Sequence, residues 1–305
     1  MVNFKDLKKK SSSNFEALTK AVESINKGGS KKDESYWEPT VDKAGNGYAV
    51  IRFLPAPKDE DLPFVRIWDH GFQGPGGWYI EKSLSTLNQP DPLAEFNSKL
   101  WNSTTDDDAP PRKQARKQKR RLSYISNIYV VSDPGNKDNE GKVFRYKYGK
   151  KIFEKINDAM HPTAPDETAF NPFDFWEGSN FKLKIRQVEG YRNYDKSEFT
   201  DTSPLSDDDS ELEEIWNKQH SLQQLLDPKN FKTYDELKRR LSTVLGDIKV
   251  ADEREEEEEE APPPKQKASP PSKTKASAPK KQAAADDDED EDSLEFFKRI
   301  AEEDE

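Results

Sequence analysis

The chain has 305 residues, which is enough for one large domain or two small domains with an appendage. Only 31% of its residues are hydrophobic and 36% are charged, so we expect part of the chain to be disordered. The sequence contains no cysteine, which excludes disulfides, iron–sulfur clusters, thiol catalysis and cysteine-ligated zinc. It also has no apolar run near the roughly 18 residues of a membrane span and no signal-peptide pattern, so we expect a soluble cytosolic protein.

The net charge of -11 is confined to one end of the chain. Residues 251–305 contain 9 basic and 20 acidic residues, so residues 1–250 have a formal net charge of zero. Within this neutral body, basic residues cluster at 8–10 and at 112–121, where seven of ten positions are Lys or Arg. One such cluster fits a solvated surface loop equally well, but two clusters beside many aromatic residues favour nucleic-acid binding.

An amphipathic helix is predicted over residues 13–27, within an N-terminal basic arm that we assign to residues 1–30. Ser13 and Glu16 have the spacing of a capping box, and Gly28 and Gly29 end the helix. Its apolar face consists of Phe15, Leu18, Val22 and Ile25. Because so short a helix cannot bury this face alone, it packs either on the body of its own chain or on a neighbouring molecule.

Residues 36–190 read mainly as short β-strands separated by turn signals. The predicted strands are 48–54, 64–68, 78–81, 122–131, 142–148 and 181–188. Five or six short strands are typical of a small barrel or sandwich. Helical spacing over 150–160 predicts a helix that caps or crosses this barrel.

Two further helices are predicted over 210–226 and 233–246. Thr233 and Glu236 have capping-box spacing at the start of the second. We expect the pair to form a small helical subdomain packed on the barrel, which completes a core domain over residues 31–250.

Residues 251–305 show no periodicity and read as a disordered acidic tail. Acidic blocks at 255–260 and 286–292 flank a segment of Pro, Lys, Ala and Ser. Apolar side chains return close to the end of the tail, where we expect a helix that folds on a partner protein. Its predicted anchors are Leu294, Phe296, Phe297 and Ile300.

The sequence does not favour an enzyme or a cofactor site. Gly135 and Gly141-Lys142 approach a phosphate-binding loop, but their spacing is one residue too long and Val143 replaces the required Ser or Thr. The sequence has neither a local metal-ligand cluster nor a Ser-His-Asp motif to supply other chemistry.

Basic and aromatic residues alternate in two predicted strands, which favours binding of single-stranded nucleic acid. In 181–186, three cations face the side opposite Phe181, Leu183 and Ile185. In 143–150, the aromatic residues share one side and the cations the other. A groove of this kind binds phosphates through its cations and stacks bases on its rings. Any single tyrosine is more often a core or surface residue, so only the set as a whole favours a binding groove.

Several stretches resemble the single-stranded DNA-binding (helix-destabilising) protein family of T4-type bacteriophages. They are 43–55 (KAGNGYAVIRFLP), 70–72 with 78–81, 139–152 (NEGKVFRYKYGKKI), and 176–181 through 194–195. The resemblance implies an OB-fold core that binds single-stranded DNA cooperatively in replication, recombination and repair, in the cytoplasm of the infected host. It also implies filament formation along DNA and contacts of the tail with replication and recombination proteins.

The resemblance assigns roles to particular residues. A basic motif for contacts between monomers is similar to Lys8, Lys9, Lys10, Ser11 and Ser12, and a related internal motif to 119–123, where Leu122 departs from the pattern. The DNA-contacting aromatic positions correspond to Tyr79, Tyr124, Tyr146, Tyr191 and Tyr194, although Ile125 stands where a tryptophan is expected.

The full predicted DNA-binding set adds Tyr148 and the basic residues of the strands and clusters. These cations are Arg112, Lys113, Arg116, Lys117, Lys119, Arg120, Arg121, Arg145, Lys147, Lys150, Lys151, Lys182, Lys184 and Arg186. We expect the acidic tail to compete with DNA for this basic groove. The alternative hypothesis is an RNA-binding protein or an acidic-tailed, chaperone-like adaptor.

The resemblance also implies a structural zinc ion held by one histidine and three cysteines. The histidine position corresponds to His70, but the cysteine positions fall near Ser83, Leu93 and Phe96. Zinc therefore cannot bind in the manner of the family. We expect hydrophobic packing to replace it, through Leu84, Leu87, Leu93, Phe96 and Leu100.

Overall fold

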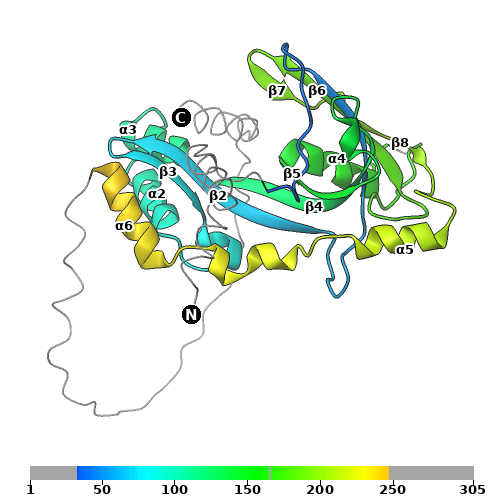
Figure 1. The fold of residues 1–305 in the computed structure, drawn as a ribbon. Helices are drawn as coiled ribbons and strands as arrows, with labels where there is room; N and C mark the ends of the chain where they lie inside the picture. Colours follow the sequence, from blue (N-terminus) through cyan, green and yellow to red (C-terminus); the bar gives the residue numbers. More distant parts are fainter. Residues whose placement is uncertain (1–32, 165, 247–305) are drawn as a thin grey trace, which may run out of the picture.

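The computed structural model describes residues 33–164 and 166–246 (Figure 1). They form an antiparallel sheet with several helices, a mixed α+β architecture. The predicted arm over 1–30 and the predicted tail over 251–305 lie outside these ranges. Within the described residues, no helix has the length and apolar character needed to cross a membrane.

All six predicted strands are confirmed, and the structure adds two short ones. The strands are β1 (Gly47–Phe53), β2 (Phe64–Gly74), β3 (Gly77–Lys82), β4 (Arg121–Ser132), β5 (Val143–Tyr148), β6 (Ser179–Val188), β7 (Tyr191–Asn193) and β8 (Glu198–Thr202). Six of them pair in the order β3-β2-β4-β1-β6-β7, while β5 pairs with β4 and β8 pairs with β6. This path is open among the described residues, so the closed barrel of an OB-fold stays a prediction.

Strand β4 lies at the centre of the sheet and is hydrogen-bonded along both edges. One edge pairs with β2 and then with β1, and the other edge pairs with β5. The residues from Ser123 to Ile128 are all buried, because both faces of this strand are covered. The buried Asn127 amide is satisfied by the backbone of His220, with which it exchanges hydrogen bonds of 2.8 and 3.0 Å.

Among the described residues, five α-helices accompany the sheet. They are α2 (Pro92–Asn102), α3 (Pro110–Lys117), α4 (Lys150–Met160), α5 (Asp209–Asn217) and α6 (Tyr234–Leu245). The predictions of α4 and α6 are confirmed, and Thr233 and Glu236 form the capping box that their spacing predicted. Helix α5 is shorter than predicted, since a separate 3₁₀ turn occupies Gln223–Leu226. Helices α2 and α3 were not predicted.

The helices join different hydrophobic clusters. Helix α4 covers the main core, which the inward side chains of β1, β4, β5 and β6 form. Helix α6 packs with α2 on the β2–β3 hairpin, whereas α5 packs near Leu54 and Phe175. Figure 1 shows α6 and α5 at opposite ends of the molecule. The expected single helical subdomain is therefore two separate packing units.

A buried arginine positions the start of β6. The Nη2 atom of Arg52 donates to the backbone carbonyls of Asp174 (2.9 Å), Phe175 (3.3 Å) and Ser203 (2.8 Å). Burial lowers the pKa of Arg52 to about 10, while the charge of Asp174 opposes that shift. A side chain at Gly178 would lie 2.9 Å from the guanidinium and 2.3 Å from a carbonyl oxygen, so only glycine fits this approach. These contacts hold the loop before β6 against β1.

The residues at the expected zinc position form a polar contact and an apolar cluster instead. His70 Nε2 lies 3.3 Å from Asp91 Oδ1, and both side chains are almost fully buried. Asp91 also accepts hydrogen bonds from Ser83 Oγ and from the backbone N–H groups of Leu84, Leu93 and Ala94, which caps α2. Of the expected replacement residues, Leu84 and Leu93 are buried in the cluster, with Leu87 and Phe96 packed against it. Leu100 is not part of it.

These side chains do not fit a zinc ion. Within the ranges that the structure describes, no group of three or more His, Cys, Asp or Glu side chains converges as metal ligands. We predict that the purified protein contains no stoichiometric zinc and that a chelator leaves its unfolding temperature unchanged. Elemental analysis and calorimetry test this prediction. One tightly bound zinc ion per chain would contradict it.

Asp91 should stabilise the fold in a pH-dependent manner. Burial acts to raise the pKa of Asp91, but the close contact with His70 and the hydrogen bonds from Ala94 N–H and Ser83 lower it to about 2. Because this folded value is below the unfolded one, the stabilisation is present above about pH 4 and is lost as the pH falls toward 2. We predict that Asp91→Asn lowers the free energy of unfolding at pH 7 by about 2 kcal/mol. Urea titrations at pH 7 and pH 3 measure the free energy of unfolding. An equal loss of stability at both pH values would contradict an origin in the charge of Asp91.

Candidate nucleic-acid interface

One surface of the sheet combines cations with exposed tyrosines, and we call it the β6 face. Alternation along β6 directs Phe181, Leu183 and Ile185 into the core and the intervening side chains outward. The strand register places Tyr48 of β1 opposite Lys184, and Tyr191 of β7 opposite Val188. The β6 face therefore contains Tyr48, Lys182, Lys184, Arg186 and Tyr191.

Both tyrosines of the β6 face are exposed to solvent. Tyr191 exposes 58% of its surface and Tyr48 exposes 42%. Lys184 Nζ lies 2.8 Å from Glu198 Oε1, and this contact lowers the pKa of Glu198. Arg186 is exposed near the end of the strand. Tyr48 was missed from the sequence, although its alternation with the buried Ala49 indicates an outward ring.

The other five predicted aromatic residues lie in the hydrophobic core. Tyr124, Tyr146, Tyr148 and Tyr194 belong to the main core, and Tyr79 to the cluster around α2 and α6. Tyr124 stacks on Phe153 with ring centroids 3.9 Å apart, and Tyr79 stacks on Phe72. Burial raises the pKa of both Tyr79 and Tyr148. Since other side chains cover these rings, we leave them out of the proposed interface.

The cations of β5 lie on the side of the strand opposite its core aromatic residues, as alternation predicts, but each has a partner. Arg145 stacks on the Tyr36 ring at 4.7 Å, lies 3.4 Å from Asp33 and donates to Ser35. Lys147 Nζ lies 2.7 Å from Asp69 Oδ2. At the start of α4, Lys150 lies 3.8 Å from Glu154, and Lys151 is half-buried.

Two adjoining hollows form a second basic surface, which we call the Arg121 groove. They have volumes of about 590 and 910 Å³ and share Gly71 and Arg121 in their walls. Aromatic side chains of Phe72, Trp78 and Phe96 line the larger hollow. The cations that line the groove are Lys82, Lys113, Lys117, Arg121, Lys147, Lys229 and Lys232.

Three lysines of the Arg121 groove were not predicted from the sequence. Lys82, Lys229 and Lys232 are far from the basic clusters along the chain, and folding of α6 onto the hairpin brings them together. Burial lowers the pKa of Lys82, whose Nζ lies 5.2 Å from the Phe231 ring centroid. Asp69, Glu81 and Glu236 also line the groove, and Glu81 pairs with Lys232. The groove is thus basic but partly neutralised.

The densest basic cluster of the sequence forms α3 and the turn that follows it. Arg112 and Arg116 pair with Asp107, and Lys113 pairs with Asp108. Arg120 stacks on the Trp68 ring at 4.3 Å, and Arg121 donates to the Gly71 carbonyl at 3.1 Å. Lys117 and Lys119 are exposed.

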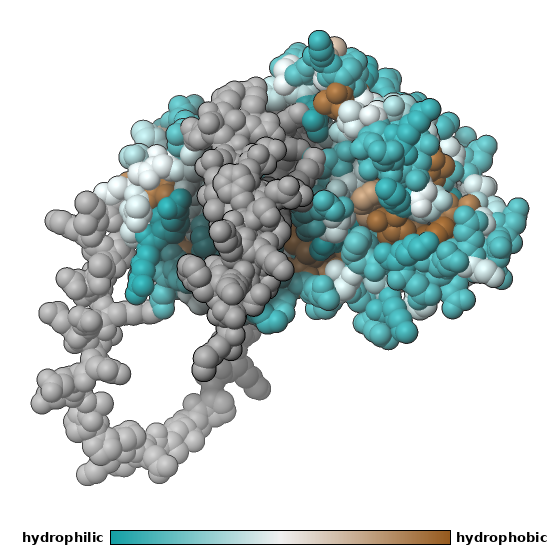
Figure 2. All heavy atoms as spheres, viewed as in Figure 1, coloured by the Kyte–Doolittle hydropathy of each residue, from teal (hydrophilic) through white to brown (hydrophobic). Residues whose placement is uncertain are grey.

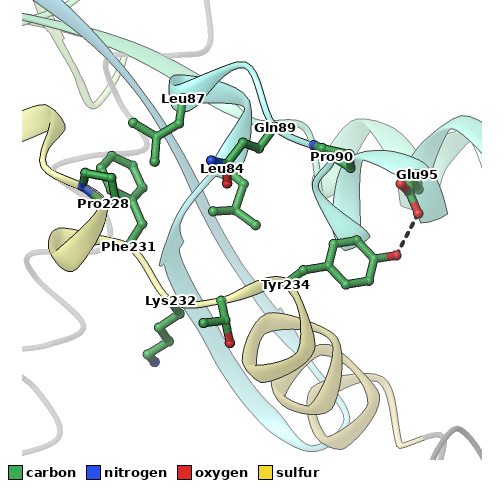
Figure 3. Close-up of a pocket in the computed structure, with 10 residues that line it drawn as sticks. Leu84, Leu87, Gln89, Pro90, Glu95, Pro228, Phe231, Lys232 and Tyr234 are labelled. Atoms are coloured by element: carbon green, nitrogen blue, oxygen red, sulfur yellow. Dashed lines mark hydrogen bonds between the residues drawn. The ribbon is translucent and has the colours of Figure 1, made fainter. Parts of the chain in front are cut away.

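A separate pocket of about 630 Å³ lies between α2 and α6 (Figure 3). Its walls include Leu84, Leu87 and Phe231, and Tyr234 points across it to Glu95, to which it donates a 2.8 Å hydrogen bond. Lys232 is the one cation in its wall, so this pocket does not suit a polyanion. Among the coloured residues of Figure 2, hydrophilic side chains make up most of the surface, with a few hydrophobic patches.

Comparisons with known proteins agree with the basic character of these surfaces. A family model described as "gp32 DNA binding protein like" matches residues 45–245, which include every strand and helix named above. A single-stranded DNA-binding protein of Enterobacteria phage T2 is 42% identical over 229 residues, covering 72% of this chain and 74% of that protein. Its counterpart in Enterobacteria phage T4 is 41% identical over 228 residues, covering 72% and 73%. The chain therefore belongs to the gp32-like family of DNA-binding proteins.

Proposed function

We propose that this protein binds single-stranded DNA without sequence preference and without catalysing a reaction. The β6 face is the observation that carries the proposal, since it places three cations beside two exposed tyrosines. A flexible single strand can present its phosphates to the cations and its bases to the rings. The names of the phage relatives support DNA as the nucleic acid.

The strand path that we propose runs from the β6 face past β5 to the Arg121 groove. Lys147 belongs to β5 and also lines the groove, so the groove reaches β5. Lysine and arginine along this path neutralise phosphates and release counterions. The affinity should therefore fall as the salt concentration rises, with a log–log slope of about −0.7 per phosphate contacted. Because only unpaired strands bind, the protein destabilises duplexes by mass action.

The proposal assigns a role to each part of the chain. Residues 31–250 form the DNA-binding core, with the strands completing an OB-fold. Residues 1–30 carry the basic motif at Lys8–Ser12 and dock on the next molecule, which makes binding along DNA cooperative. Residues 251–305 compete with DNA for the basic surfaces and present Leu294–Ile300 to replication and recombination proteins. This arrangement suits replication, recombination and repair of phage DNA in the host cytoplasm.

Binding is tested first by titrating the intrinsic fluorescence of the full chain with poly(dT) at two salt concentrations. We predict steep, salt-sensitive quenching by poly(dT) and little response to duplex DNA. Poly(rU) serves as the comparison for RNA. An equal response to duplex DNA, or a marked preference for poly(rU), would contradict the proposal.

The β6 face is tested by Tyr191→Ala and Tyr48→Ala. Because stacking is worth about 1–3 kcal/mol per base, each substitution should weaken binding roughly five- to 150-fold. Fluorescence anisotropy of a labelled oligo(dT) measures the affinity. The matched control is Trp176→Ala, which removes an aromatic ring of similar exposure (57%) that lies outside the β6 face. Equal losses in all three variants would show that the β6 face has no special role.

The tail is tested by a chain that ends at Val250. Removing the acidic residues of 251–305 should tighten binding to poly(dT) and change its salt slope, because a competitor of the DNA is lost. The affinity is measured across a range of salt concentrations, with the full chain as reference. Unchanged affinity and slope would rule out competition by the tail.

A further inference from the structure

The corner between α2 and α3 holds two arginines around a single carboxylate oxygen. Arg112 Nη1 lies 2.5 Å from Asp107 Oδ1, and Arg116 Nη2 lies 3.1 Å from the same atom. The hydrogen bond from Arg112 is the main cause that lowers the pKa of Asp107. A carboxylate oxygen held by two guanidinium groups resembles a phosphate oxygen in charge and geometry.

Both arginines are also ordered by an exposed tryptophan. Their guanidinium carbons lie 4.4 Å (Arg112) and 5.5 Å (Arg116) from the centroid of the Trp101 ring, which is 40% exposed. Arg112 Nε donates to the Thr104 carbonyl at 3.0 Å, and Arg116 Nη1 donates to the Asp107 carbonyl at 2.6 Å. The two side chains are therefore held in place before any ligand arrives.

We infer that Arg112 and Arg116 form a phosphate subsite for single-stranded DNA, that Trp101 contacts the adjoining nucleotide, and that Asp107 occupies this subsite until DNA displaces it. The inference rests on the proposed function and deepens it. The Asp107 side chain is 69% exposed, so solvent screens its ion pairs and it exchanges readily. A phosphodiester brings the same negative charge and adds contacts at neighbouring phosphates.

The position of α3 connects this subsite to the proposed strand path. Lys113 and Lys117 of the same helix line the Arg121 groove together with Arg121 itself. A strand that leaves the groove along α3 reaches Arg116 and Arg112 next. The subsite is thus an extension of the groove, and Asp107 reduces affinity there without blocking the rest of the path.

The decisive variant is Asp107→Asn in the full chain. Asparagine keeps the size of the side chain but removes the charge that competes with phosphate. We predict that affinity for poly(dT) rises about two- to fivefold, which is the scale of an exposed ion pair, and that the salt slope becomes steeper. Asp106→Asn is the matched control, because it makes the same charge change one residue away, where the carboxylate caps the Asp108 N–H rather than an arginine. An equal gain in the control, or no gain in Asp107→Asn, would overturn the inference.

A second comparison tests whether the two guanidinium groups are needed or whether positive charge alone is enough. The double variant Arg112→Lys with Arg116→Lys keeps the positive charges but loses the planar guanidinium groups. Adding Asp107→Asn to it should therefore no longer raise the affinity. A full gain in that background would also overturn the inference. If the unaltered chain failed to bind poly(dT), the proposed function would fall together with the inference. If it binds and Asp107→Asn does not differ from it, only the inference falls.

Discussion

The hydrogen-bonded pairing of β4 along both edges determines where the other parts of the described fold lie. Its first half joins the β2–β3 hairpin, and its second half joins β1 and, through it, β6. Because β5 pairs along the opposite edge, side-chain alternation is fixed in several strands at once. That alternation sends the aromatic side chains of β5 into the main core and its cations to the opposite face. The proposed DNA path depends on this separation.

Much of the strand and helix pattern was predictable because period-2 alternation and capping signals are local. Helix α3 was missed because its sequence is almost entirely polar, and only Ala115 of it is buried. Helix α2 could have been found, since Asp91 before Pro92 is a cap signal and Leu93, Phe96 and Leu100 have helical spacing. The pairing of strands and the separation of α5 from α6 are long-range properties that no local pattern encodes.

The cations of the candidate interface could be predicted from the sequence, whereas its aromatic residues were harder to predict. Alternation alone gave Lys182, Lys184 and Arg186 an outward direction, as the structure has them. The same rule sends Tyr146 and Tyr148 inward with Phe144, because a row of aromatic residues on one side of a strand is usually its core side. The ion pairs of α3 were not predictable as a site, although the acidic residues at 106–108 directly precede it. Several cations of the proposed path, among them Arg116, Lys147 and Lys184, pair with carboxylates, so binding there requires exchange of carboxylates for phosphates.

The claim that one continuous basic path holds the strand can be tested by photocrosslinking. Oligo(dT) with 5-bromodeoxyuridine at single positions would be bound to the full chain and irradiated, and the crosslinked peptides would be mapped by mass spectrometry. We predict crosslinks at Tyr48 and Tyr191 from one part of the strand and at Trp101 from another, all suppressed by high salt. Crosslinks confined to residues outside the β6 face, the Arg121 groove and the α2–α3 corner would contradict it.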